Sequence, residues 1–144
     1  MINLDDILKK LDKTIKENEM LITATSGGPD SMALLSLLIK LSKTKKITII
    51  CAHVNHNLRK ESQEEAIMVE KYANENNLIF EKMEINHYEG NTENYARTQR
   101  YNFFEKLIKK FNATYLLTAH HGDDLTETIL MRMVRGSSLK GYSG

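Results

Sequence analysis

The stretch from Ser26 to Ser31 combines residue types that can bind a phosphate group. It reads SGGPDS and lies between an apolar run and a leucine-rich one. Gly27 and Gly28 permit positive φ and close approach of a ligand, while Pro29 fixes φ early in the turn. If a helix begins here, its first amides and its dipole favour an anion. The stretch predicts a phosphate-binding turn; the alternative is that serine and aspartate cap a core helix.

Asp30 adds a negative charge to this predicted turn. A carboxylate beside a phosphate is repulsive unless a cation lies between them. Mg²⁺ is commonly held by one or two carboxylates together with substrate phosphates. The turn matches neither GxxxxGK followed by Ser or Thr nor GxGxxG, so a different kind of nucleotide site is indicated. We therefore expect Asp30 to bind Mg²⁺.

Two arginines extend an apolar helix face toward the same region. The apolar positions of this predicted helix are Phe104, Leu107, Ile108 and Phe111. Backward steps of three and four residues from them reach Arg100, Arg97 and Glu93. Because a helix that follows a strand begins near the carboxyl edge of the sheet, we expect both arginines to project over the phosphate turn. The alternative is that they are solvated surface residues.

A second charged group precedes the last apolar segment. His120 and His121 end the run YLLTAHH, and Asp123, Asp124 and Glu127 follow at once. A helix here would join these acids to the apolar positions Leu130, Met131 and Val134. Zinc is a weaker interpretation than Mg²⁺, since adjacent histidines at a strand end point apart and carboxylates suit a hard cation. We expect Asp123 to share the metal with Asp30.

These residues require a sheet edge to bring them together. Apolar periodicity predicts helices and strands in alternation: helices over 3–18, 31–42, 62–76, 92–111 and 123–135, and strands over 20–25, 47–54, 78–85 and 114–119. Alternation of this kind is typical of an α/β fold, a doubly wound and mostly parallel sheet with helices on both faces. In such sheets, ligands collect at the carboxyl ends of the strands.

Composition narrows the class of protein. The chain has 144 residues, a net charge of +1 with histidines neutral, and a single cysteine. One domain over 1–144 is the expectation, without a disulfide framework. Cys51 lies in the apolar run ITIICAHV and reads as a small buried residue. No segment has the ~20 apolar residues of a membrane span, which favours a cytoplasmic protein.

The motifs resemble a known family. SGGPDS resembles the SGGxDS signature of the PP-loop ATP pyrophosphatases, which have an adenine nucleotide alpha hydrolase-like fold and cleave ATP between the α and β phosphates. Three further blocks are similar, in order and spacing, to the amino-terminal domain of the tRNA(Ile)-lysidine synthetases: AHVNHNLRKES, NTENYARTQRYNFF and LLTAHHGDDLTETILMRMVRGSSLKGYSG. The resemblance covers about residues 20–144.

This resemblance implies a ligase that forms a C–N bond. ATP would activate C2 of the wobble cytidine of an isoleucine tRNA with a CAU anticodon as an adenylate. The amine of free lysine would then displace AMP to give lysidine. Family members continue into further domains that help hold the tRNA, so the chain is expected to be a fragment that binds ATP and lacks activity alone.

The resemblance also assigns roles to individual residues. ATP phosphates and Mg²⁺ would be held by Ser26, Gly27, Gly28, Pro29, Asp30 and Ser31, and the adenine would approach His53, Val54 and Asn55. Arg97 and Arg100 would contact phosphate or the activated nucleotide. Metal, lysine or cytidine would be organised by His120, Asp123, Asp124 and Glu127. Arg132 and Arg135 would meet RNA phosphate. Leu125 departs from the glutamine that the family commonly has there.

Two other functions fit parts of the sequence. A PP-loop tRNA thiolase would share the phosphate turn, but such enzymes rely on cysteines for sulfur or cluster handling, and Cys51 is a poor substitute. A non-catalytic ATP-binding module would retain the sheet alone. The acidic group at the head of the last predicted helix argues against it, because simple nucleotide binding does not require such a group.

Overall fold

The computed structural model describes residues 4–121 and 129–137. Helices and strands alternate along most of this length. Their bounds are α1 (Leu4–Thr14), β1 (Met20–Ala24), α2 (Pro29–Ser42), β2 (Thr48–Asn55), α3 (Ser62–Glu75), β3 (Ile79–Glu84), α4 (Thr92–Phe111), β4 (Tyr115–His121) and β5 (Ile129–Arg135). The predicted strands and the first four predicted helices are therefore confirmed, with small shifts at their ends.

The described strands form one five-stranded sheet in the order β3-β2-β1-β4-β5. β1 to β4 run parallel to one another, and β5 pairs antiparallel with β4. The chain adds strands on one side of β1 and then returns to its other side with β4. This reversal creates a switch point between β1 and β4, where open α/β sheets bind ligands. The predicted α/β class with a mostly parallel sheet is confirmed.

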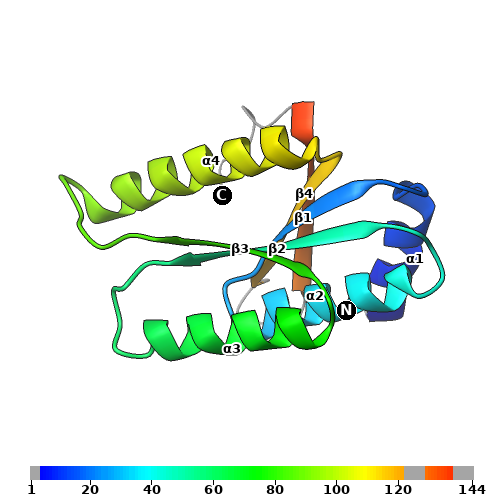
Figure 1. The fold of residues 1–144 in the computed structure, drawn as a ribbon, viewed down its shortest axis with the longest axis horizontal. Coiled ribbons are helices and arrows are strands. Elements are labelled where there is room, and N and C mark those ends of the chain that lie inside the picture. Colours follow the sequence, from blue (N-terminus) through cyan, green and yellow to red (C-terminus); the bar gives the residue numbers. More distant parts are fainter. Residues whose placement is uncertain (1–3, 122–128, 138–144) are drawn as a thin grey trace.

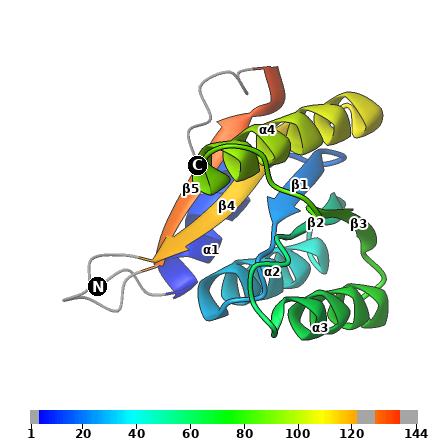
Figure 2. The same ribbon diagram turned by 90° about the vertical axis from the view of Figure 1, so that its left-hand side faces the viewer.

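Helices cover both faces of the sheet (Figures 1 and 2). Of the described helices, α1, α2 and α3 lie on one face and α4 lies on the other. Side chains of a strand alternate between the faces, so Leu21 packs toward α1 and α2 while its neighbour Ile22 packs toward α4. Burial on both faces explains why the β1 and β2 sequences are mostly apolar and do not alternate regularly with polar residues.

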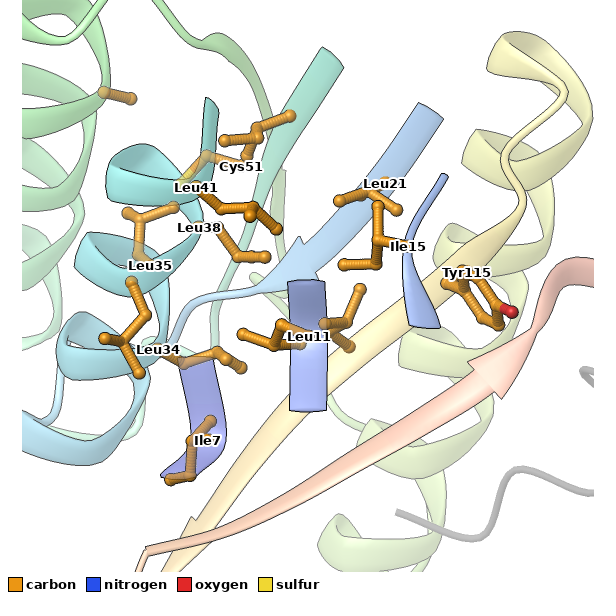
Figure 3. Close-up of a cluster of buried hydrophobic side chains, with 14 of the residues drawn as sticks. Ile7, Leu11, Ile15, Leu21, Leu34, Leu35, Leu38, Leu41, Cys51 and Tyr115 are labelled. Carbon is orange, nitrogen blue, oxygen red and sulfur yellow. The ribbon is translucent and has the colours of Figure 1, made fainter. Parts of the chain in front are cut away.

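The larger core cluster joins the first two helices to the sheet (Figure 3). Leu11 and Ile15 are fully buried against leucines of α2 and against Leu21. Cys51 lies in the same cluster and is fully buried, as the sequence predicts. This packing fixes α2, and with it the turn that precedes α2, against the centre of the sheet.

The last described element differs from its prediction. A helix over 123–135 is wrong for residues 129–135, which form β5 and pair with β4 from Tyr115↔Arg135 to His121↔Ile129. Met131 and Met133 share one face and pack against the larger core cluster, whereas Val134 lies on the other face. Pairing with the free edge of β4 prevails over the local three- and four-residue apolar spacing. Residues 123–128 of that predicted helix lie outside the described part.

A helix that crosses a membrane must be both long and apolar. Within residues 4–121 and 129–137, no helix combines these two properties.

Candidate active site

A cavity of about 440 Å³ opens at the carboxyl edge of the sheet. It lies at the ends of β2, β1 and β4, and α3 and α4 contribute its sides. The described lining consists of Ala24, Thr25, Ser26, Ser31, Ala52, His53, Val54, Asn55, His56, Leu58, Arg59, Ser62, Glu65, Arg100, Phe104, Thr118 and Ala119. The cavity therefore occupies the place where the strand order predicts a ligand.

The turn between β1 and α2 is held by its own serines. Ser26 Oγ accepts a hydrogen bond from the Gly28 amide at 3.2 Å, and Ser31 Oγ accepts one from the Gly27 amide at 3.2 Å. Ser31 Oγ donates to the Gly28 carbonyl at 3.1 Å, and the two hydroxyls are 3.2 Å apart. Both serines line the cavity. A compact turn with polar groups at the start of a 14-residue helix is a suitable cradle for an anion.

Gly27 has the backbone conformation that the sequence predicts for this turn. Its φ is +98°, a backbone angle that residues with a Cβ rarely adopt. A Cβ on Gly27 would meet Glu65 Cβ and Val69 Cγ2 of α3, both at 3.5 Å. These are ordinary contacts, so the requirement for glycine comes from the backbone angle. The turn also lies directly against α3.

His53 links β2 to the phosphate turn. Its Nδ1 is 2.7 Å from the Thr25 carbonyl oxygen, and the side chain is 2% exposed. Because a carbonyl can only accept, Nδ1 carries the proton and Nε2 becomes an acceptor when the ring is neutral. His53, Val54 and Asn55 all line the cavity. The structure thus brings the predicted adenine-binding segment beside the turn.

His56 also lines the cavity, although the sequence pattern does not single it out. Burial, then the positive charges of Arg100 and His53, lower the pKa of His56 below the ordinary histidine value. Its carbonyl accepts a hydrogen bond from the Tyr88 hydroxyl at 2.5 Å. A neutral imidazole beside an arginine can accept a hydrogen bond or a proton. The available sequence signal is the segment NHNLRKE, which reads as a polar loop.

The loop after β2 is fixed by asparagines. Asn57 has φ +53° and donates its amide to Asn55 Oδ1 at 3.0 Å. Its side chain donates to the Ile85 carbonyl at 3.1 Å. Asn55 in turn donates to Gln63 Oε1 at 3.1 Å. These bonds set where His56 and Arg59 lie relative to the sheet edge.

The two predicted arginines of α4 have different positions. Arg100 lines the cavity one helical turn before the buried Phe104. Arg97 lies at the helix surface, where its side chain is 53% exposed and its Nη2 is 4.0 Å from Glu93 Oε1. The helix itself begins as predicted, with Asn91 Oδ1 accepting from the Asn94 amide at 3.0 Å. Of the two, only Arg100 belongs to the described lining.

Asp30 lies in the first turn of α2. Gly27, Gly28 and Pro29 precede it in the turn between β1 and α2. None of these four residues is among the described residues that line the cavity. No group of three His, Cys, Asp or Glu side chains able to hold a metal occurs among the described residues. A single carboxylate is one ligand of the kind that Mg²⁺ takes together with substrate phosphates and water.

The remaining predicted residues come at the end of β4 or later in the sequence; of these, Arg132 pairs opposite Thr118 and Arg135 opposite Tyr115, at the start of β4. Asp123, Asp124 and Glu127 are outside the described residues, as is the side chain of His120. Arg132 and Arg135 belong to β5, and Arg135 lies 5.8 Å from the centre of the Tyr115 ring. Their predicted roles stay predictions. Thr118 and Ala119 bring the end of β4 into the cavity.

The site combines features that suit transfer of a nucleotide group. Hydroxyls and a helix start can bind phosphate, while Arg59 and Arg100 supply positive charge. Alanine, valine and phenylalanine side chains line the same cavity and offer an apolar surface to a planar ring. An adenine nucleotide has both an apolar ring and a phosphate chain.

Comparison with known proteins places the fold in a family. The PP-loop domain family matches residues 2–144. A tRNA(Ile)-lysidine synthase of Bacillus cereus is 43% identical over 98% of this chain, and one of Geobacillus kaustophilus is 42% identical over 90%. The matches cover 31% and 30% of those proteins, so the chain spans about a third of the length of these curated relatives.

A solved structure with the same fold is the U34-tRNA thiolase NcsA of Methanococcus maripaludis, described with its [4Fe-4S] cluster. Its TM-score is 0.64 at 17% sequence identity, and the match covers 78% of this chain and 43% of that one. At this identity the likeness concerns the fold alone.

Proposed function

The chain belongs to the PP-loop domain family, and from that premise we propose that it is the ATP-using part of a tRNA(Ile)-lysidine synthase. The observation that carries this proposal is the cavity at the carboxyl edge, where the SGGPDS turn meets His53 and Arg100. The identity to lysidine synthases across almost the whole chain supports the choice within the family. The reaction would take place in the cytoplasm.

ATP would occupy the cavity with its phosphates toward α2. Ser26 can donate its hydroxyl proton to a phosphate oxygen, whereas Ser31, whose hydroxyl donates to the Gly28 carbonyl, holds the turn in shape. The helix start adds a favourable dipole. The adenine would lie toward His53, Val54 and Asn55, with apolar atoms of Ala24 and Ala52 nearby. Arg100 would offset negative charge that develops on the reacting phosphate.

The chemistry would proceed in two displacements. The oxygen on C2 of the wobble cytidine attacks the α-phosphorus of ATP, an O–P bond forms, and pyrophosphate leaves. The amine of free lysine then attacks C2, a C–N bond forms, and AMP leaves with the oxygen. The amine loses a proton in this step. We assign His120, Asp123, Asp124 and Glu127 to lysine, cytidine or metal, and Arg132 and Arg135 to RNA phosphate.

Mg²⁺ is the metal that this site would use. Asp30 would hold it, and Asp123 would share it. The ion would neutralise phosphate charge when bound. With the ion in place, the Asp30 carboxylate would attract the phosphate chain through the metal and would no longer repel it. Ser31, its neighbour, holds the turn in place.

The thiolase alternative has less support. The cysteine of this chain, Cys51, is fully buried in the core, and burial raises the pKa of its thiol. A buried protonated thiol cannot serve as a sulfur nucleophile. The likeness to a thiolase structure is a likeness of fold.

The test is transfer of labelled lysine to tRNA. The chain, and a longer chain extended to the length of the curated relatives, are incubated with ATP, Mg²⁺ and an isoleucine tRNA bearing CAU. The matched control tRNA differs at the wobble cytidine. We expect label in the first tRNA alone, for the longer chain at least. Absence of label with both chains would refute the proposed function and favour a PP-loop protein with another substrate.

A further inference from the structure

Arg59 and Glu65 form an ion pair within the cavity lining. Arg59 lies in the loop after β2, and Glu65 lies in the first turn of α3. The Arg59 side chain is 63% exposed, whereas that of Glu65 is 29% exposed. The pair thus joins a largely solvated guanidinium to a carboxylate that is more enclosed.

The carboxylate of this pair stands beside the phosphate turn. A Cβ on Gly27 would lie 3.5 Å from Glu65 Cβ, so α3 and the turn are in direct contact at Glu65. A phosphate chain bound over the turn would meet this negative charge. Like charges in a partly enclosed site repel more strongly than in bulk water. Glu65 therefore opposes the ligand that the turn favours, unless a cation compensates it.

Arg59 can neutralise either the Glu65 carboxylate or a phosphate bound over the turn. The planar guanidinium binds carboxylates and phosphates through the same fork of N–H donors. An exposed ion pair contributes little to stability, so little is lost when Arg59 leaves Glu65. Charge-assisted bonds to phosphate are among the stronger polar contacts. The two anions can therefore compete for one arginine.

We propose that Arg59 exchanges the Glu65 carboxylate for the β or γ phosphate of bound ATP, and returns to Glu65 when pyrophosphate leaves. This inference rests on the proposed function, because it takes the cavity as the ATP site. Arg59 is then a binding residue for the polyphosphate chain. Glu65 is a competing anion that weakens binding and speeds release of the pyrophosphate product.

If Arg59 exchanges partners in this way, substitutions of Arg59 and of Glu65 should change the affinity for phosphate ligands in opposite directions. Calorimetry measures the affinities of the chain for ATP, pyrophosphate and adenosine. Arg59→Ala should weaken ATP and pyrophosphate binding by about tenfold or more, and Glu65→Gln should tighten both by several-fold. Adenosine, which has no phosphate, should bind all variants alike. A pair with a purely structural role would give changes of the same sign from either side.

Two variants test whether Arg59 contacts the phosphates directly or acts only through its positive charge at a distance. Arg59→Lys keeps the charge but loses the fork, and should bind pyrophosphate several-fold more weakly than the wild type. Lys110→Ala removes a charge from an ion pair with Glu81, outside the cavity lining, and should leave the affinity unchanged. Equal binding by Arg59→Lys and the wild type would overturn the contact.

The controls also distinguish this inference from the proposed function. A wild-type chain that fails to bind ATP would refute the proposed ATP site, and the exchange with it. A wild-type chain that binds ATP, with Arg59→Ala and Glu65→Gln equal to it, would refute the exchange alone. Thermal unfolding of each variant confirms that the fold is retained.

Discussion

At the scale of single residues, Gly27 has a backbone conformation with positive φ on which the geometry of the site depends. Its φ of +98° disfavours any side chain, although a Cβ would find ordinary contacts. Gly27→Ala should therefore cost about 1–2 kcal/mol of stability, and the resulting shift of the turn should weaken ATP binding. Urea unfolding and calorimetry measure the two effects.

Gly90 offers a matched control for this substitution. Its φ is +63° and a Cβ there would meet nothing within 4 Å. Gly90→Ala should show a similar stability loss for the same backbone reason. ATP affinity should be unchanged, because Gly90 lies in the loop between β3 and α4 and is not part of the turn between β1 and α2. A wild-type affinity in Gly27→Ala would show that the geometry of the turn does not govern binding.

His56 makes stability depend on pH. Burial, then the charges of Arg100 and His53, lower its pKa in the folded chain. As the pH falls below about 6.5, His56 becomes protonated in the unfolded chain while it stays neutral in the folded chain. The stabilising contribution is present above that pH and is lost as the pH falls through the lowered pKa of the folded state. His56→Gln should flatten the stability profile in this window.

Nuclear magnetic resonance titration of the His56 ring checks the cause directly. Arg100→Gln removes a positive charge and should raise the pKa of His56, whereas Lys110→Ala should leave it where it is. The Tyr88 hydroxyl contacts the His56 carbonyl, so His56→Gln retains that bond. An unshifted pKa in Arg100→Gln would show that Arg100 does not act on this ring.

At the scale of elements, the attachment of β5 depends on a close approach at Gly136. The Gly136 amide donates to the Thr114 carbonyl at 2.8 Å. A Cβ on Gly136 would lie 2.3 Å from the Ala113 carbonyl oxygen and 3.0 Å from Ile108 Cγ2. A backbone carbonyl cannot move away from the added Cβ without shifting the chain. Gly136→Ala should therefore lower the free energy of unfolding by about 1–3 kcal/mol.

The loss should be local to the sheet edge. Amide hydrogen exchange should become faster in β5 and along the β4 edge, while α4 and β1 keep their protection. Ser137→Ala, at an exposed neighbouring position, serves as the control and should change neither rate nor stability. Unchanged exchange in Gly136→Ala would contradict the close approach that holds β5.

The elements also show where sequence reasoning succeeds. The helix over 92–111 is predicted at the observed bounds, because its apolar stripe, which includes Phe104 and Leu107, acts locally. The structure adds the Asn91 cap at its start. The segment 129–135 is predicted as a helix because its apolar residues recur at three- and four-residue spacing. Its observed partner, β4, is selected by tertiary pairing, which short-range periodicity does not contain.

At the scale of the whole molecule, the sheet converts separate motifs into one cavity. The turn at Ser26 to Ser31 can be predicted from sequence, because it follows a strand whose carboxyl end a parallel sheet places at the ligand edge. The segment His53 to Asn55, which ends β2, is predicted through the family resemblance. His56, Arg59 and Glu65 could not be predicted in this way. Their side chains reach the cavity through a loop fixed by Asn57 and through the seating of α3 on the turn, and both depend on the packed structure.

The central claim is that ATP binds in this cavity. A titration of the isotopically labelled chain with ATP, followed by amide chemical shifts, tests it most directly. We expect concentrated shifts at residues 25–31 and 53–59 and around Arg100, with small shifts in α1 at the far end of the sheet. Shifts confined to α1 and the end of α2, or no shifts at saturating ATP, would contradict the assignment of this cavity as the ATP site.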